Sequence, residues 1–288
     1  MLATQKGGNV TGRGTSAPGL RLKIVRSAVR QLLRRAGLEL VRLPAQGTLD
    51  HHLGRLLDGL AVDCVVDVGA YVGEYAALCR RLGYAGRIVS FEPASDSYRR
   101  LAARARDDPE WKTVRCALGS VEGPRSLHVS ALGDLSSFHH RSEYNVSLIG
   151  DGGRIVGEER VEVHRLDALL PTHVGDLAAP RVFLKVDTQG SDLDVLRGAE
   201  GVLPLVVGLH VELAVRPLYA GVVTYLDGLG ELEGLGFELT GLFPVASEHG
   251  VRVIEFECLM TRPGAWTPPS PPANPAPFRG AERKRGPR

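Results

Sequence analysis

Two segments of the sequence carry side chains at a spacing that suits a nucleoside-containing ligand. Asp67 lies in an apolar, β-branched run that passes into a turn bracketed by Gly69 and Gly73. A turn between a strand and a helix aims free N–H groups and the positive end of the helix dipole at a ligand. Glu92 ends the next apolar run, about 20 residues further on, where an acidic side chain accepts hydrogen bonds from ribose in doubly wound sheets. This order predicts a cofactor that contains a ribose.

The spacing of the glycines narrows the identity of that cofactor. A dinucleotide fingerprint that begins at Gly69 needs glycines at positions 71 and 74, where the chain has Tyr71 and Glu74. The pattern that remains, D-x-G-x-x-x-G, resembles the first motif of S-adenosylmethionine (SAM) methyltransferases. The alternative is that the glycines only make a strand-to-helix turn, and that Glu92 is an ordinary residue before a proline-marked turn.

A third segment extends the resemblance to one family. The run Leu-Lys-Val-Asp-Thr-Gln-Gly at 184–190, with a helical pattern ending in Leu-Arg-Gly-Ala at 196–199, is similar to the signature of FkbM-type methyltransferases. Similar stretches at 165–170, at 211–219 and before Cys258 extend the resemblance over residues 60–262. The chain departs from many relatives at Gln189, where they have Glu, and at Glu257, where Asp is common.

The resemblance implies a fold, a cofactor and the residues that hold it. The fold is the class I, Rossmann-like SAM-methyltransferase variant of the doubly wound α/β sheet, and the cofactor is SAM. We expect the methionine part to lie at Asp67, Gly69, Ala70, Tyr71 and Gly73, the ribose at Glu92, and the adenine edge at Cys116, Ala117 and Leu118.

Three further residues are candidates for the methyl-accepting end of the site. A sugar hydroxyl is a poor nucleophile until a base begins to remove its proton. Ligands of open α/β sheets bind outside the carboxyl ends of the strands, and Asp187 follows such a strand. His210 and Glu212 share one face of the next strand, by its period of two. We therefore expect the general base and the acceptor contacts among Asp187, His210 and Glu212.

Each of these residues also has a structural interpretation. Asp187 could cap the helix expected at 191–200, although Thr188 and Ser191 offer other caps. A single histidine in a strand, such as His210, is commonly a hydrogen-bonded structural residue. His139 and His140, in a long polar segment, could contact the acceptor or lie on the surface.

The rest of the core sequence alternates strands and helices. This rhythm predicts a mostly parallel sheet of the seven-stranded type with helices on both faces. The last two apolar runs lack a helix between them and could pair as an antiparallel hairpin at the sheet edge. Strands are expected near 63–68, 87–91, 112–117, 182–186, 205–213, 237–242 and 251–260, and helices near 73–83, 95–106, 191–200 and 222–234. Residues 119–166 interrupt the rhythm with two strands, near 126–130 and 160–166, around a polar loop that could bind a ligand.

Composition divides the chain into four parts. Residues 1–19 are of low complexity and are expected to be disordered, and residues 263–288 are expected to form a disordered, proline-rich basic tail. Residues 20–59 are expected to hold a basic amphipathic helix, at 20–36, and a link. Residues 60–262 form the expected SAM-dependent methyltransferase domain. The helix at 20–36 could lie on an anionic membrane surface or pack on the catalytic body.

Charge and cysteine content exclude several classes of function. Residues 1–50 carry a net charge of +7 and residues 261–288 one of +5, which leaves −10 for residues 51–260. An acidic body argues against a nucleic-acid groove. The four cysteines form no C-x-x-C pair, so no metal site is expected. No apolar run reaches the length of a membrane span, and no signal peptide is evident, so we expect a cytoplasmic protein with possible peripheral contact at the inner membrane face.

These expectations combine into one functional hypothesis. The chain should transfer a methyl group from SAM to a hydroxyl, most simply on a sugar of a glycolipid or cell-envelope glycan. The acceptor could instead be a polyketide or another secondary metabolite. Outside enzymes, the alternatives are a non-catalytic Rossmann-like module that binds SAM, and a protein that docks on membranes through its basic ends.

Overall fold

A computed structural model describes residues 47–175 and 177–267. The expected disordered segment at 1–19 and the expected basic helix at 20–36 lie outside the described residues, as does most of the basic tail. Among the described residues, no helix is long and apolar enough to cross a membrane.

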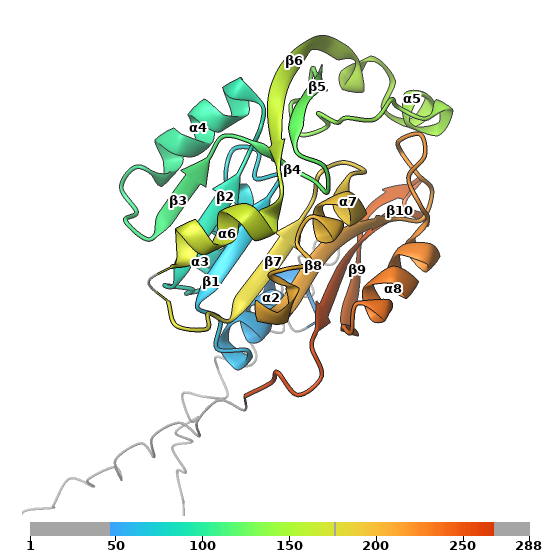
Figure 1. The fold of residues 1–288 in the computed structure, drawn as a ribbon. Coiled ribbons are helices and arrows are strands. Elements are labelled where there is room, and N and C mark those ends of the chain that lie inside the picture. The colour runs from blue at the N-terminus through green and yellow to red at the C-terminus, as the bar shows by residue number, and fades with distance from the viewer. Residues whose placement is uncertain (1–46, 176, 268–288) are drawn as a thin grey trace, which may run out of the picture. The chain divides into compact units, whose positions relative to one another are not determined.

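A seven-stranded sheet with the strand order β3-β2-β1-β7-β8-β10-β9 forms the centre of the molecule (Figure 1). Its strands are β1 (Cys64–Val68), β2 (Arg87–Phe91), β3 (Trp111–Val114), β7 (Val182–Val186), β8 (Val206–Ala214), β9 (Glu238–Glu248) and β10 (Arg252–Thr261). The five strands from β3 to β8 are parallel, and β10 lies antiparallel to both β8 and β9. Every residue of β1 and β7 is buried, as apolar β-branched strands covered on two faces should be. The predicted mostly parallel α/β sheet with an antiparallel edge hairpin is confirmed.

Helices cover both faces of this sheet. The helices α2 (Leu49–Gly59), α3 (Glu74–Arg81) and α4 (Ser95–Ala105) pack on one face, and α6 (Leu166–Val174), α7 (Asp192–Arg197) and α8 (Tyr225–Gly234) pack on the other. The alternation along β1 decides which residue faces which layer, because Val65 packs with the first group of helices and Val66 with the second. Asp67, two residues after Val65, therefore faces the layer of α2, α3 and α4.

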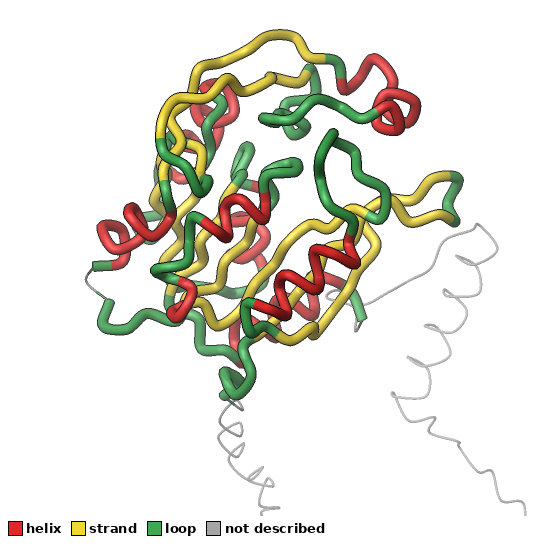
Figure 2. The backbone as a smooth tube through the Cα atoms, turned by 45° about the vertical axis from the view of Figure 1, so that its right-hand side comes forward, coloured by secondary structure: helices red, strands yellow, loops and turns green. Residues whose placement is uncertain are grey.

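A smaller sheet interrupts the chain between β3 and α6. It has the order β4-β6-β5, with β4 (Ala117–Leu118), β5 (Gly123–Ser130) and β6 (Ile155–His164), and the helix α5 (Glu143–Ile149) lies between β5 and β6. We call residues 117–164 the arm. It curves over the loops at one end of the main sheet (Figure 2). The Ser137 hydroxyl donates to the Gln189 carbonyl (2.6 Å), and the Tyr71 hydroxyl donates to the Leu132 carbonyl (3.3 Å), so the arm closes over the carboxyl ends of the parallel strands.

The structure differs from the expected elements at five places. The end of the expected link is the helix α2, whose N-cap Thr48 accepts a hydrogen bond from the backbone of His51. A further helix, α6, follows β6, and α5 was not expected in the arm. The strand expected near 112–117 is divided between the two sheets as β3 and β4. The fold continues past residue 262, because Thr267 donates its N–H to the Gly59 carbonyl (2.8 Å).

Candidate active site

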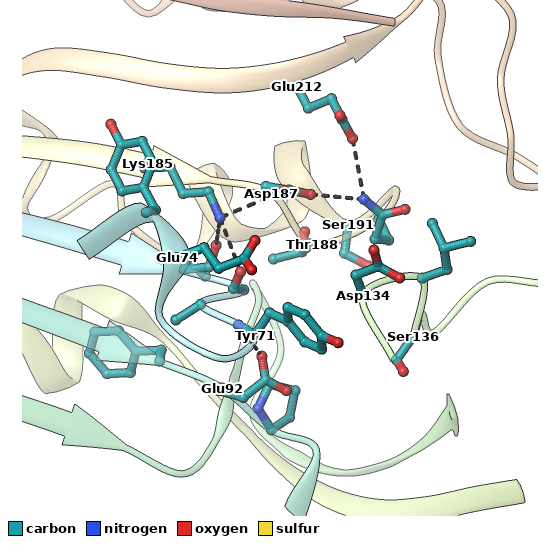
Figure 3. Close-up of a pocket in the computed structure, with 18 of the residues that line it drawn as sticks. Tyr71, Glu74, Glu92, Asp134, Ser136, Lys185, Asp187, Thr188, Ser191 and Glu212 are labelled. Atoms are coloured by element: carbon teal, nitrogen blue, oxygen red, sulfur yellow. Dashed lines mark hydrogen bonds and ion pairs between the residues drawn. The ribbon is translucent and has the colours of Figure 1, made fainter. Parts of the chain in front are cut away.

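A cavity of about 570 Å³ opens at the carboxyl ends of the parallel strands, beneath the arm (Figure 3). This is where ligands bind in open α/β sheets. Its walls contain most of the residues that the sequence singled out, namely Gly69, Ala70, Tyr71, Glu92, Cys116, Ala117, Leu118, Asp187, His210 and Glu212. Asp67 and Gly73 do not line it. The cavity has one end beside Glu92 and another beside Asp187, which follows β7, and the carboxyl groups of β8 and β10. We call these the Glu92 end and the Asp187 end.

Glu92 is held rigidly at the first end. Its carboxylate accepts hydrogen bonds from the backbone N–H groups of Tyr71 and Ala94, each at 2.8 Å. Burial raises the pKa of Glu92 to about 7, and those two hydrogen bonds and the charge of Lys185 act in the opposite direction. Each carboxylate oxygen has two lone pairs, so the group can still accept hydrogen bonds from ligand hydroxyls.

The wall beside Glu92 is apolar. Cys116, Ala117 and Leu118 connect the end of β3 to the arm, and all three are buried. Phe138 and Leu127 of the arm extend this wall. Flat aromatic ligands bury themselves against such surfaces, so these residues can hold an adenine.

The two glycines of the first motif make room for protein atoms. A Cβ on Gly69 would lie 1.8 Å from the Asp187 carbonyl, and one on Gly73 would lie 2.8 Å from the Trp111 ring. Both residues also have positive φ, of +71° and +82°. Gly69 lines the cavity and Gly73 does not, so the expected contact of Gly73 with the ligand is not supported. Gly69 lets the first loop approach the strand β7, and Gly73 lets the start of α3 pack on the core.

Asp67 lies behind the cavity wall with no exposed surface. Its Oδ2 accepts a hydrogen bond from Ser90 (3.1 Å), and its Oδ1 lies 3.4 Å from the Lys185 ammonium. Burial raises the pKa of Asp67, while Lys185 and Ser90 favour its ionised form. The expected direct contact between Asp67 and a ligand is not supported, because Asp67 is fully buried and does not line the cavity, whereas its partner Lys185 does.

Lys185 is a site residue that we did not single out from the sequence. Its ammonium donates to the carbonyls of Val68 (3.3 Å) and Gly69 (3.0 Å), and it lies 3.6 Å from Asp187 Oδ2. Burial alone would lower the pKa of Lys185, but the carboxylates of Asp187, Asp67 and Glu257 outweigh it and raise that pKa. Lys185 thus links the first glycine loop to Asp187. A lysine inside an apolar strand, next to a strand that carries an aspartate, is the signal that could have revealed it.

Asp187 projects into the second end of the cavity, with a third of its side chain exposed. Its backbone N–H donates to the Val68 carbonyl (3.1 Å), which holds the end of β7 beside the first glycine loop. The Gln189 amide donates to Asp187 Oδ1 (2.9 Å) and to Glu212 Oε2 (3.2 Å). The capping interpretation of Asp187 is not supported, because Ser191 is at the N-cap of α7 and no side chain makes a cap hydrogen bond there.

Sheet register explains why ionisable groups gather at this end. Asp67 is paired with Lys185, Lys185 with His210, and Glu212 with Glu257, so their side chains share one face of the sheet. Burial raises the pKa of Glu212 well above its ordinary value and that of Glu255 to about 7, in both cases with help from Asp187. A raised pKa favours the neutral form of a carboxyl group, which can donate a hydrogen bond.

His210 is buried, and both of its ring nitrogens have partners. Its Nε2 lies 2.7 Å from Glu257 Oε2, and its Nδ1 lies 3.1 Å from the Tyr75 hydroxyl. A carboxylate can only accept, so Nε2 carries the proton and Nδ1 accepts from Tyr75. This arrangement leaves no ring nitrogen free to take a proton from a ligand. It favours the structural interpretation of His210.

The histidines of the arm take different positions. His139 Nε2 lies 3.1 Å from the Ser191 hydroxyl, at a second hollow beside the loop 189–191, while His140 stacks on His128 with 4.7 Å between the ring centroids. Neither lines the main cavity. Across the described residues, no group of three or more His, Cys, Asp or Glu side chains is arranged to hold a metal ion.

Comparison with known proteins places the chain in a family. The model of the methyltransferase FkbM domain matches residues 67–239. The hexuronic acid methyltransferase AglP of Haloferax volcanii is 27% identical over 152 residues, which are 52% of this chain and 56% of that relative. The chain thus spans about half the length of that relative.

Solved structures of two methyltransferases are similar at low identity. One is the magnesium protoporphyrin IX methyltransferase of Synechocystis PCC 6803 with bound SAM (TM-score 0.41, 11% identity, 86% of each chain covered). The other is the 1,6-didemethyltoxoflavin-N1-methyltransferase of Burkholderia thailandensis (TM-score 0.40, 11% identity, 88% of this chain and 93% of that chain covered). With the family model covering more than half of its residues, the chain belongs to the FkbM methyltransferase family.

Proposed function

We propose that this chain transfers the methyl group of SAM to a hydroxyl oxygen of a sugar, with Asp187 as the general base. The observation that carries the proposal is the position of Asp187. A partly exposed carboxylate projects into the cavity from a strand end that is hydrogen-bonded to the first glycine loop. The base is thereby fixed beside the region in which the cofactor is expected.

The residues of the cavity fit SAM in three respects. Glu92 offers a carboxylate to the two ribose hydroxyls, and the wall of Cys116 to Leu118 offers an apolar surface to adenine. The carboxylates at the other end suit a sulfonium cation. The cavity volume of about 570 Å³ lies within the range of about 300–1,000 Å³ usual for sites of this kind. The Gly69 loop and Tyr71 would then hold the methionine part.

The remaining chemistry falls to the protein. SAM supplies an electrophilic methyl group, whose transfer breaks a C–S bond, forms a C–O bond, leaves the electron pair on sulfur and releases the hydroxyl proton. Asp187 takes up that proton. Lys185 and Gln189 each hold one oxygen of Asp187, which keeps the carboxylate pointed at the acceptor. The neutral forms of Glu212 and Glu255 can donate hydrogen bonds to other acceptor hydroxyls.

Two observations support a sugar as the acceptor. The Haloferax relative acts, by its name, on a hexuronic acid. The Asp187 end of the cavity is also rich in polar groups, as a polyhydroxylated ligand requires, whereas an aromatic polyketide would need an apolar wall there. The expected contact with a glycolipid or membrane surface, and the expected cytoplasmic location, remain predictions.

The test begins with binding of S-adenosylhomocysteine to the intact chain by isothermal titration calorimetry. Tritiated SAM is then supplied with three acceptors, a neutral methyl hexoside, a methyl hexuronide and a phenol. We expect binding in the micromolar range and a labelled methyl ether on at least one glycoside. Binding with transfer to the phenol alone would contradict the sugar acceptor, and folded protein that does not bind would contradict the whole proposal.

A further inference from the structure

The strongest unassigned feature of the site is the side chain of Gln189, between two carboxylates and a phenol. Its Nε2 lies 2.9 Å from Asp187 Oδ1 and 3.2 Å from Glu212 Oε2, while its Oε1 lies 2.8 Å from the Tyr219 hydroxyl. The NH₂ group donates to both carboxyl groups, because an ionised carboxylate and the carbonyl oxygen of a neutral carboxyl group each accept hydrogen bonds. The amide oxygen then accepts from Tyr219, and the orientation of the amide is fixed by chemistry.

The backbone of Gln189 is held in an unfavourable conformation to achieve this. Its φ of +55° is left-handed, which a residue with a side chain adopts rarely, and Gly190 follows with a φ of +104°. The Ser137 hydroxyl of the arm donates to the Gln189 carbonyl (2.6 Å). A strained residue that the surroundings hold in place, at the wall of a ligand cavity, is a candidate for a functional role.

The charges around Asp187 explain what a neutral amide at this position achieves. The groups that interact electrostatically with Asp187 or with its partner Lys185 come from every element around them, namely Asp67 from β1, Tyr75 and Cys79 from α3, Glu92 after β2, Asp134 from the arm, Lys185 from β7, Asp192 from α7, Glu212 from β8, Tyr219 from the loop after β8, and Glu255 and Glu257 from β10. Lys185 is the one cation in this set. A third carboxylate between Asp187 and Glu212 would have to share a proton with them, because like charges at hydrogen-bond distance oppose ionisation.

We propose that Gln189 is a positioning residue, which bridges Asp187 and Glu212 through its amide and keeps the Asp187 carboxylate oriented and free to accept the proton of the acceptor hydroxyl. This inference rests on the proposed function, because it assigns Asp187 as the base. Gln189 does not touch the transferred methyl group. It acts through Asp187, and Tyr219 in turn fixes Gln189.

Two substitutions separate charge from orientation. Gln189→Glu keeps the shape of the side chain but replaces its NH₂ group with a carboxyl oxygen, which places a third carboxyl group beside Asp187 and Glu212. Gln189→Met removes the hydrogen bonds to Asp187 and Glu212 without adding a charge. For Gln189→Glu we expect kcat at pH 7 to fall about tenfold and the acid limb of the kcat–pH profile to move up by roughly one pH unit. For Gln189→Met we expect a similar fall in kcat with an unmoved acid limb.

A charge control and a folding control accompany these variants. Val245→Glu adds a carboxylate at an exposed position on the rim of the same cavity, and its acid limb should move much less than that of Gln189→Glu. The dissociation constant of S-adenosylhomocysteine should stay within about threefold of the native value in both Gln189 variants. An unmoved acid limb in Gln189→Glu overturns the inference, as does a loss of cofactor affinity in step with a lowered Tm, which would indicate a merely structural role.

A second readout does not depend on knowing the acceptor. The carboxyl carbon of Asp187 is followed by ¹³C NMR against pH in the complex with S-adenosylhomocysteine, and the signal is assigned with Asp187→Asn. The titration midpoint should rise by roughly one pH unit in Gln189→Glu relative to the native chain. An equal midpoint overturns the role of Gln189 even if a sugar is methylated. If the midpoint rises but the protein methylates no glycoside, the bridging role of Gln189 is upheld. Only the proposed sugar acceptor is then contradicted.

Discussion

The two ends of the cavity hold their carboxylates with different groups, backbone N–H groups at one end and side chains at the other. At the Glu92 end, backbone N–H groups from two loops hold one carboxylate, and apolar side chains complete the wall. At the Asp187 end, side chains from β7, β8 and β10 hold one another through hydrogen bonds and ion pairs. The first arrangement suits a part of the ligand that never changes, and the second suits proton transfer to a variable acceptor. The difference predicts that a substitution at the Asp187 end mainly lowers kcat, and that one at the Glu92 end weakens cofactor binding.

The largest effect is expected for Asp187→Asn. The amide preserves the shape of the side chain but cannot take the hydroxyl proton, so kcat should fall by a factor of about 10² to 10⁴. The dissociation constant of S-adenosylhomocysteine should change by less than about threefold, because the Glu92 end is intact. Steady-state kinetics and calorimetry give the two quantities. Asp96→Asn, the same change at an exposed position of α4, serves as the control. A native rate in Asp187→Asn would remove Asp187 from the role of base.

Gly69→Ala tests whether the first glycine serves packing. Its Cβ would meet the Asp187 carbonyl at 1.8 Å, and its φ is positive, so we expect the free energy of unfolding to fall by about 3 kcal/mol or more. Gly83→Ala is the matched control, because Gly83 also has a positive φ, of +93°, but has open space around its Cβ. That variant should lose only about 1 kcal/mol. Urea unfolding measures both, and equal losses would show that the close approach to β7 does not matter.

Glu92→Gln should change how stability depends on pH. Because the pKa of Glu92 is raised to about 7 from its ordinary value of 4.5, the folded chain retains a proton that the unfolded chain has lost between these two values. The free energy of unfolding therefore falls as pH rises through this window, by up to about 1.4 kcal/mol per pH unit, and stays lower above pH 7. Glutamine does not titrate, so the variant should lack this contribution.

The comparison is made by urea unfolding of both proteins at pH 5, 6 and 7. Other buried acids, such as Glu255, contribute a slope of the same sign to both proteins and cancel in the difference. The variant should also bind S-adenosylhomocysteine about tenfold more weakly, since the glutamine amide has one oxygen acceptor where the native carboxylate has two. Identical slopes in the two proteins would mean that Glu92 is not protonated in the fold near neutral pH.

The sequence revealed the relation between the first glycine loop and Glu92, but not the hydrogen-bond network at the Asp187 end, for a physical reason. Asp67, Gly69 and Glu92 belong to two successive strand-to-loop segments, so their relation is visible as spacing along the chain. The Asp187 end depends on cross-strand register between β7, β8 and β10, which spacing does not reveal. Lys185, which is paired with Asp67 of β1, was missed although it stood inside a recognised motif. His210 could be paired with Glu257 only once β10 was known to lie beside β8.

Parts of the fold also escaped prediction. The helix α2 was not predicted, although Thr48 is its N-cap and its leucines recur at helical spacing and are buried on the sheet. In the arm, β4 has only two residues, and it is a strand because β6 returns beside it. Gly69 was recognised as essential for the turn, but the atom that would collide with its side chain, the Asp187 carbonyl, lies more than a hundred residues away.

A crystal structure of the intact chain with S-adenosylhomocysteine tests the central claim most directly. The account predicts ribose hydroxyls on the Glu92 carboxylate, adenine against Cys116 to Leu118, and the sulfur facing the end of the cavity where Asp187 projects. A ligand bound outside this cavity, or bound within it with the ribose away from Glu92 and the sulfur away from Asp187, would contradict it.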